Sequence, residues 1–258
     1  MTETEPRRPV ASSGARRLPA TGAGYQIVAD PAVFASTAAA VLARRIVALS
    51  DQERVAIALS GGSTPKPVYR ALAEHAEIEW HRVEVFFADE RLVPFDDPAS
   101  NFGMARSSLL DRIPVPKAQV HPLPAEASDL DAALEAYAAR MPDRLDIIVL
   151  GVGTDGHTAS LFPRSAALRA TAPLTRSRAP EAPHERITVT PPVIQSARLL
   201  LVLATGPEKS APVRAATAES GDVEECPARL ARRGIWILGR DVVADWRSDD
   251  ARPRGTPA

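Results

Sequence analysis

Six short apolar runs, separated by turn residues, constrain the fold of this chain more than any other feature of its sequence. They lie at 25–29, 54–59, 83–88, 145–151, 198–204 and 234–238. Each has the length of a β-strand, and several are apolar throughout, which is typical of parallel strands buried on both faces. Helical patterns lie between them, at 30–49, 64–75, 103–113, 129–141 and 208–218. The alternation predicts an α/β fold, with a doubly wound, mostly parallel sheet and helices on both faces.

The remaining segments set the expected domain organisation. Residues 1–24 are rich in Arg, Pro, Ser, Gly and Ala and lack the apolar stretch of a signal peptide, so we expect a disordered tail there and another at 247–258. Residues 25–246 are expected to form a single domain, since 258 residues that are 45% hydrophobic can bury one sizeable core. The Pro- and Arg-rich segment 163–192 is predicted to form a small lid or lobe beside the sheet.

Composition excludes several classes of function. The chain has 31 basic and 32 acidic residues, so it has no general field that would attract nucleic acid or anionic lipid. Its longest apolar run, 199–204, is far shorter than the roughly 20 residues of a membrane helix. The single cysteine, Cys226, excludes an internal disulfide and cannot alone form a metal site. We expect a cytoplasmic protein, a monomer or small homo-oligomer, without nucleic acid, membrane or metal.

The loop SGGSTPKP follows the second apolar run, and ligands of parallel sheets bind beyond the carboxyl ends of the strands. Gly61 and Gly62 let the backbone approach a ligand, while Ser63 or Thr64 can cap the next helix. The exposed amides and the helix dipole would then favour phosphate. An ordinary strand-to-helix turn is the alternative, and the Walker pattern is absent.

Two further loops follow strands at the same edge. Asp89, Glu90 and Arg91 come directly after a run that ends in two phenylalanines and an alanine. Either a buried strand directs one of these charges into a crevice, or the triplet is solvated. Gly206 and Lys209 follow the run 198–204. Gly206 would let the backbone approach a phosphate closely, and Lys209 would supply a cation for it. The alternative is that Lys209 is only a solvated surface lysine. Each of these signals is weak alone.

The fourth loop has the spacing G-x-G-x-x-G, at Gly151, Gly153 and Gly156. A dinucleotide-binding loop should open a long helix and find an acidic residue about 20 positions later. Pro163 interrupts such a helix, no acidic residue lies between 158 and 180, and Asp155 would repel a pyrophosphate. We therefore interpret the loop as a glycine-permitted turn that presents Asp155 and His157.

His157 is the histidine best placed for chemistry. A neutral imidazole, with a reference pKa of about 6.5, can take a proton from water at neutral pH, and a positioned base contributes roughly 100- to 10,000-fold in rate. Asp155 could orient the ring and stabilise its protonated form. A packed, purely structural histidine is the alternative.

Five segments in order, ALSGGSTP, FFADERLVPFDDPASNFGMARSSLL, DIIVLGVGTDGHTASLFP, ERITVTPPVI and ATGPEKS, together resemble the 6-phosphogluconolactonase family. The resemblance runs from about 26 to 236 and implies a fold similar to glucosamine-6-phosphate deaminase and ribose-5-phosphate isomerase. It also implies hydrolysis of the small-molecule lactone 6-phospho-D-glucono-1,5-lactone to 6-phosphogluconate, in the oxidative pentose phosphate pathway, without a metal or organic cofactor.

The resemblance also implies roles for individual residues. His157 would be the base that activates water, and Asp89 and Arg91 would line the substrate. The phosphate-holding groups would be Gly61, Gly62, Ser63, Thr64 and Lys209. Apart from the resemblance, attack of water on the lactone needs a donor for the oxyanion, and Arg91 or a backbone amide could supply it. Arg164 departs from the family pattern, which usually has a glycine after L-F-P.

Three alternatives remain at this point. An amino-sugar-phosphate isomerase or deaminase of the same fold would carry a supporting glutamate where this chain has Phe162. A serine hydrolase would use Ser60 or Ser160, although neither lies in a G-x-S-x-G motif. A sugar-phosphate sensor without turnover would usually carry a DNA-reading module, for which the chain has no spare domain.

Overall fold

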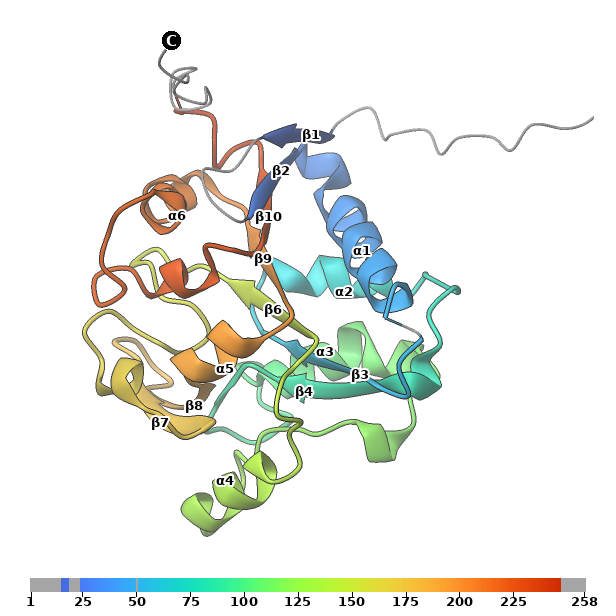
Figure 1. The fold of residues 1–258 in the computed structure, drawn as a ribbon. Helices are drawn as coiled ribbons and strands as arrows, with labels where there is room; N and C mark the ends of the chain where they lie inside the picture. The colour runs from blue at the N-terminus through green and yellow to red at the C-terminus, as the bar shows by residue number, and fades with distance from the viewer. Residues whose placement is uncertain (1–14, 19–23, 50, 247–258) are drawn as a thin grey trace, which may run out of the picture.

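The computed structural model describes residues 15–18, 24–49 and 51–246 (Figure 1). Its main sheet has seven strands in the order β1-β2-β10-β9-β6-β3-β4. Their bounds are β1 Ala15–Leu18, β2 Tyr25–Ala29, β3 Val55–Leu59, β4 Val83–Phe87, β6 Ile147–Gly151, β9 Leu199–Ala204 and β10 Ile235–Gly239. All except β1 run parallel, and β1 pairs antiparallel with β2 at the edge.

Each of the six apolar runs forms a strand of this sheet. β3 and β10 are buried at every position, and β9 at every position but its first. The predicted mostly parallel sheet is confirmed. β1 falls inside the segment 1–24, where a tail is expected. The rest of that segment up to residue 23, and the predicted tail 247–258, lie outside the described residues.

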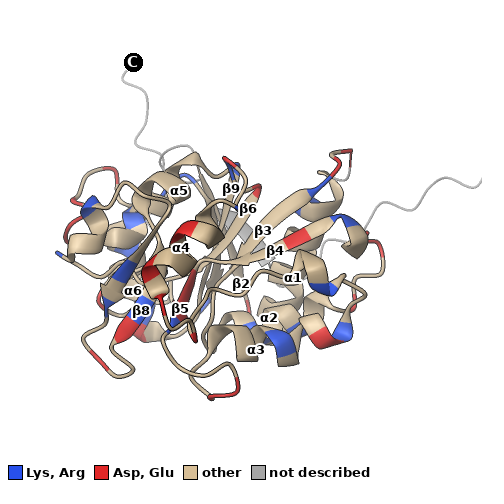
Figure 2. Ribbon diagram, turned by 90° about the horizontal axis from the view of Figure 1, so that it is seen from below, with Lys and Arg blue, Asp and Glu red and all other residues tan. Residues whose placement is uncertain are grey.

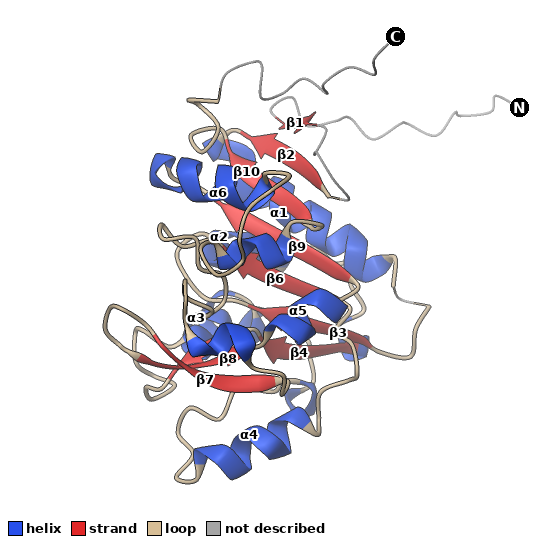
Figure 3. Ribbon diagram, turned by 60° about the vertical axis from the view of Figure 1, so that its left-hand side comes forward, coloured by secondary structure: helices blue, strands red, loops and turns tan. Residues whose placement is uncertain are grey.

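Helices cover both faces of the sheet, as the alternating pattern predicts. Their bounds are α1 Pro31–Val47, α2 Pro65–Leu72, α3 Asn101–Ser108, α4 Leu130–Ala138, α5 Pro191–Ser196 and α6 Ser210–Thr217. Figures 2 and 3 show α1, α2 and α3 on one face and α5 and α6 on the other. The sequence pattern does not predict α5, because it is short and begins with two prolines. No described helix is long and apolar enough to cross a membrane.

A second, smaller sheet forms beside the first. It contains β5 Asp89–Arg91, β7 Leu174–Arg178 and β8 Glu185–Val189, all antiparallel, in the order β5-β8-β7. β7 and β8 confirm a small lobe within 163–192. The triplet 89–91, expected as a loop, is instead a strand of this lobe, and it places Arg91 opposite Arg186 of β8. The lobe is therefore attached directly to the end of β4.

The order of strands creates a crevice at one edge. β3 pairs with β4 on one side and with β6 on the other. The chain leaves β3 toward β4 and later returns to β6, so the loops that follow β3 and β6 run in opposite directions. Ligands of open α/β sheets bind where the strand order reverses in this way. All four loops selected from the sequence lie at the carboxyl ends of the parallel strands, beside this crevice.

Arg164 adopts a backbone conformation that explains the glycine implied there by the resemblance. Its φ is +60°, in the left-handed region that favours glycine. Nε and a terminal nitrogen of its guanidinium donate to the two carboxylate oxygens of Glu225, at 2.9 and 2.8 Å. The departure from the family pattern is thus accompanied by a bidentate ion pair to the loop that precedes Cys226.

Candidate active site

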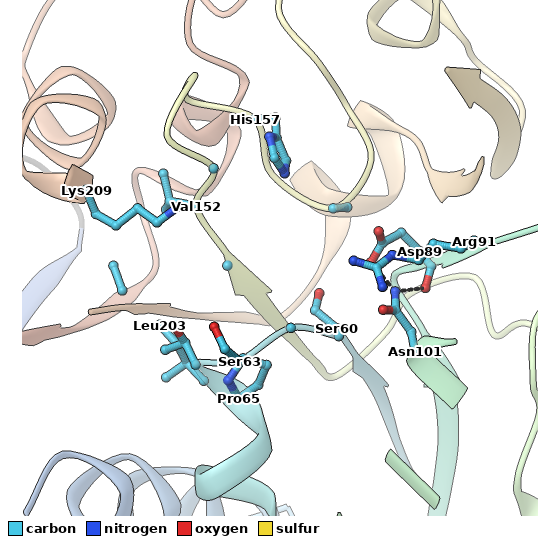
Figure 4. Close-up of a pocket in the computed structure, with 17 residues that line it drawn as sticks. Ser60, Ser63, Pro65, Asp89, Arg91, Asn101, Val152, His157, Leu203 and Lys209 are labelled. Atoms are coloured by element: carbon cyan, nitrogen blue, oxygen red, sulfur yellow. Dashed lines mark hydrogen bonds between the residues drawn. The ribbon is translucent and has the colours of Figure 1, made fainter. Parts of the chain in front are cut away.

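A cavity of about 200 Å³ opens at the crevice, lined by the loops that follow β3, β4, β6 and β9 (Figure 4). The residues predicted from sequence that line it are Gly61, Gly62, Ser63, Thr64, Asp89, Arg91, His157 and Lys209. Asp155 lines an adjoining cavity of about 240 Å³, which shares Asp89, Arg91 and His157 with the first. We call these the first and second cavity. The structure therefore brings all nine predicted site residues to one place.

His157 is held by the carboxylate of Asp155. Its Nδ1 lies 2.6 Å from Asp155 Oδ1, and its backbone N–H donates to the same oxygen at 3.0 Å. The imidazole packs on the ring of Phe162, with 4.7 Å between centroids, and its side chain is one-third exposed, at 33%. When Nδ1 donates its proton to Asp155, Nε2 carries the free lone pair. The ring is thus oriented to act as a base through Nε2.

Glycines shape the turn that presents this pair. A Cβ on Gly153 would overlap Nδ1 of His157 and Oδ1 of Asp155, so the pair needs a residue without a side chain there. Gly156 has φ +85°, in the left-handed region, and its amide donates to the carbonyl of Gly153 at 3.1 Å. The backbone N–H of Gly153 donates to the carbonyl of His157 at 2.8 Å. The G-x-G-x-x-G spacing therefore positions an imidazole.

The environment favours the ionised form of Asp155. Burial raises its pKa, but the hydrogen bonds and the charge of His157 outweigh that effect and hold the pKa below its usual value. Asp155 is consequently a carboxylate at neutral pH. A carboxylate at this distance stabilises the imidazolium that forms when His157 takes a proton.

Asp89 and Arg91 reach the cavities from β5. Asp89 is buried, and its carboxylate accepts hydrogen bonds from Ser160 Oγ at 2.7 Å and from Asn101 Nδ2 at 3.2 Å. The Arg91 guanidinium donates to the carbonyl of Ala99, while its buried Nε has no hydrogen-bond partner among the described residues. Asp89 is thus fixed in orientation, and Arg91 retains donor capacity toward the cavity.

Glu90 points away from Asp89 and Arg91, because successive side chains of a strand alternate between its faces. It is 1% exposed, and its carboxylate accepts from the backbone amides of Asn101, Phe102 and Arg91 at 2.7, 2.7 and 2.8 Å. Ser100 Oγ donates to it at 3.2 Å. Burial raises the pKa of Glu90, and the amide hydrogen bonds oppose that effect. The middle residue of the triplet therefore anchors the start of α3.

We expect Glu90→Ala to lower the free energy of unfolding by about 3 kcal/mol or more, because it leaves buried donors without an acceptor and creates a cavity. Urea unfolding followed by circular dichroism measures the change. Glu185→Ala is the matched control, since Glu185 lies on the neighbouring strand with its side chain 54% exposed. Its effect should stay below about 1 kcal/mol. Equal effects of the two substitutions would contradict the anchoring role.

The opposite side of the first cavity carries the predicted phosphate groups. Gly62 has φ +108°, and Thr64 occupies the N-cap position of α2. The Thr64 hydroxyl does not cap the helix but lies 3.0 Å from the hydroxyl of Thr205. The backbone N–H of Lys209 donates to the carbonyl of Gly206 at 3.0 Å, and its side-chain ammonium has no hydrogen bond or ion pair with any described residue. Figure 4 shows Lys209 and Arg91 on opposite sides of the cavity, with His157 between them.

Two buried polar residues of the cavities, Asn101 and Arg186, escape the sequence-based selection. Asn101 lines the first cavity, and its buried Oδ1 has no hydrogen-bond partner among the described residues. Arg186 lines the second. Asn101 and Arg186 lie inside segments that carry the resemblance, in ASNFG and ERITVT, but polar residues in such segments do not reveal by themselves which are buried.

The two serines considered as nucleophiles are not paired with a histidine. Ser160 Oγ donates to Asp89, and Ser60 Oγ is buried without a hydrogen-bond partner in the described structure. A serine nucleophile needs a base within hydrogen-bond reach, in most cases a histidine. This geometry favours activation of water by His157 over attack by serine. Within residues 15–18, 24–49 and 51–246, no group of three His, Cys, Asp or Glu side chains could hold a metal ion.

Comparison with known proteins agrees with the fold and the site. The model of the family described as glucosamine-6-phosphate isomerases/6-phosphogluconolactonase matches residues 29–238. The chain is 37% identical over 221 residues to a 6-phosphogluconolactonase of Synechocystis sp., covering 80% of this chain and 91% of that protein. It is 36% identical over 241 residues to that of Mycobacterium leprae, with 86% and 98% covered.

Solved structures give the same relationship. The 6-phosphogluconolactonase from Leishmania guyanensis matches with a TM-score of 0.75 at 30% identity, covering 86% of this chain and 98% of that one. The enzyme of the same name from Thermotoga maritima matches with a TM-score of 0.76 at 25% identity, with 84% and 99% covered. The chain therefore belongs to the 6-phosphogluconolactonases, within the glucosamine-6-phosphate isomerase/6-phosphogluconolactonase family.

Proposed function

We propose that this protein hydrolyses 6-phospho-D-glucono-1,5-lactone to 6-phospho-D-gluconate, with His157 as the base that activates water. The observation that carries the proposal is an imidazole fixed by a carboxylate, in a cavity with a lysine on one side and an arginine on the other. Membership of the 6-phosphogluconolactonases supports the same reaction. Its place would be the second step of the oxidative pentose phosphate pathway.

The reaction needs one proton carrier and one site for negative charge. Water attacks C1 of the lactone while Nε2 of His157 takes one of its protons, and the carbonyl oxygen becomes an oxyanion. The C1–ring oxygen bond then breaks, and the imidazolium returns the proton to the ring oxygen. The new carboxylic acid loses its remaining proton to solvent. Asp155 stabilises the imidazolium throughout, and Asp89 is placed to accept a hydrogen bond from a sugar hydroxyl.

Phosphate binding is assigned to the side of the first cavity opposite Arg91. The backbone amides of the loop Gly61, Gly62, Ser63 and Thr64 lie at the N-terminus of α2, where the helix dipole favours an anion. Lys209 adds a full positive charge that no described residue neutralises. A substrate whose phosphate is bound there would extend its ring toward His157.

Phe162 distinguishes hydrolysis from the isomerase or deaminase reaction of the same family. Those reactions open a sugar ring and move a proton from C2, which needs an additional acid–base group. In this chain the position expected for a supporting carboxylate carries an aromatic ring, which packs on His157. Hydrolysis of a reactive lactone needs no such group, so lactone hydrolysis is favoured.

The direct test is an assay with freshly prepared 6-phosphogluconolactone, in a pH-stat or coupled to oxidation of the product. Glucosamine 6-phosphate is assayed in parallel. We expect turnover of the lactone far above its spontaneous hydrolysis and none of the amino sugar. Turnover of the amino sugar would assign the chain to the other branch of the family. Binding of the sugar phosphate without acceleration of lactone loss would identify a sensor.

We expect Lys209→Ala to raise KM by about 10- to 100-fold while kcat falls much less, because the lysine binds phosphate in the ground state and the transition state alike. Steady-state kinetics with the lactone measure both constants. Lys66→Ala is the control, since Lys66 is an exposed lysine of α2 that lines neither cavity. A kcat loss with unchanged KM would assign Lys209 to the chemical step instead.

The compartment is also a proposal. Cys226 is a free, buried thiol. Free thiols are typical of reducing compartments, and we therefore propose a cytoplasmic enzyme.

A further inference from the structure

Arg186 is a buried arginine whose side chain has no partner among the described residues. It is only 8% exposed, and its Nε is buried without a hydrogen bond to any of them. Its guanidinium forms no ion pair within the part of the chain that the structure describes. Burial and the positive charge of Arg91 lower its pKa, while the charges of Asp89 and Glu90 act in the opposite direction. A buried positive charge without a hydrogen-bonded or ion-paired partner is unfavourable, so this side chain is suited to binding an anion.

The position of Arg186 limits which anion that can be. It lines the second cavity with Arg91, its neighbour across the β5–β8 pair, and with His157. Two carboxylates of this cavity are already engaged, because Asp89 accepts from Ser160 and Asn101, and Asp155 accepts from His157. Glu181, the third, is exposed at the rim. The two arginines therefore remain available to a ligand.

The chemistry of the reaction matches this arrangement. Lys209 lies on the side of the first cavity opposite Arg91. Arg186 does not line that cavity but lines the second one, together with Arg91 and His157. The product carries a phosphate at one end of a six-carbon chain and a carboxylate at the other. Negative charge at C1 develops beside the base, first as the oxyanion and then as the carboxylate. A site with two cationic ends separated by the base fits such a molecule.

We propose that Arg186 receives the negative charge at C1, donating to the oxyanion and then to the product carboxylate, with Arg91 beside it. The assignment rests on the proposed lactone hydrolysis and adds a second arginine to its machinery. A planar guanidinium suits a carboxylate because two parallel N–H groups can bind two oxygens.

The test compares two ligands that differ only at C1. Both 6-phosphogluconate and glucitol 6-phosphate carry the phosphate, but only the first has a carboxylate. Calorimetric dissociation constants are measured for the parent, Arg186→Gln, Arg186→Lys and Lys209→Ala. The parent should prefer 6-phosphogluconate. In Arg186→Gln that preference should fall by about 10- to 100-fold, and in Lys209→Ala both ligands should weaken while the preference is kept. Arg186→Lys should give an intermediate preference.

Turnover and stability complete the test. Arg186→Gln should lower kcat by roughly 10- to 100-fold with little change in KM, and its melting temperature should not fall, because a buried charge without a partner is removed. Arg176→Gln is the control, since Arg176 lies on neighbouring β7 and pairs with the exposed Asp131. It should match the parent in every readout.

Three results would overturn the assignment. Equal weakening of both ligands in Arg186→Gln would place the phosphate there, and an unchanged preference with native stability would leave the arginine outside the site. A lower melting temperature with unchanged preference would make its role structural. A parent that binds both ligands with the expected preference yet does not hydrolyse the lactone would refute the proposed function, while the binding constants would still test Arg186.

Discussion

Replacing His157 with alanine is expected to lower kcat for lactone hydrolysis by about 10²- to 10⁴-fold and to leave the fold intact. The side chain is one-third exposed and lies in a turn beyond the end of β6, so its loss removes little packing. The substitution removes the imidazole that is assigned to take the proton from water, while Asp89, Arg91 and Lys209 remain in the first cavity. Initial rates with the lactone, corrected for its spontaneous hydrolysis, measure the effect.

His75→Ala is the matched control for this substitution. His75 also lies beside a carboxylate two residues away, with its Nδ1 2.7 Å from Glu77, but it lines neither cavity. Its rate constants should equal those of the parent. If the His157 variant also keeps the parental rate, the base is another residue and the mechanism proposed above is wrong.

Gly153→Ala should lower kcat by roughly 100-fold although it replaces no reacting group, since misplacing a catalytic group by about 1 Å can cost that much. The added methyl group would overlap His157 Nδ1 and Asp155 Oδ1, so the pair has to separate or turn. We expect the loss in kcat, because phosphate binding lies on the other side of the cavity. Steady-state kinetics and a crystal structure of the variant would show whether the pair has moved.

Gly151→Ala tests whether the effect depends on position. A Cβ at Gly151 would meet no atom within 4 Å, so the histidine should stay in place and kcat should remain within a few-fold of the parent. Gly151 is the last residue of β6 and Gly153 lies two residues later in the loop that follows, and both substitutions add the same methyl group. If both variants lose activity equally, the glycines serve the backbone of the loop rather than the imidazole.

The sequence predicts the sheet because its strands are buried on both faces. β3, β9 and β10 are almost wholly apolar, whereas an amphipathic helix has apolar residues only at every third or fourth position. Once the strands are placed, the site follows from topology, since residues after parallel strands meet at one edge. This is why the residues selected from four separate loops line two adjoining cavities.

The roles within that location depend on information the sequence does not carry. Asp89, Glu90 and Arg91 are three adjacent charges, and only the formation of β5 sends the middle one to α3 and the others to the cavities. Arg186 is one of many arginines, and what distinguishes it is that its side chain is buried without a partner in the part of the chain that the structure describes. Strand pairing between distant segments determines both properties, and local patterns do not encode it.

The pairing of β5 with β8 has a consequence for substrate entry. β5 follows β4 after a single residue and is hydrogen-bonded to β8. A rigid-body movement of β7 and β8 away from the main sheet would therefore break the β5–β8 hydrogen bonds or displace Arg91 as well. The tip of the β7–β8 hairpin, where Ala179, Pro180 and Glu181 border the second cavity, is free of that constraint. We therefore expect the second cavity to widen by bending of this tip, while Arg91 and Arg186 keep the spacing that the β5–β8 pairing sets.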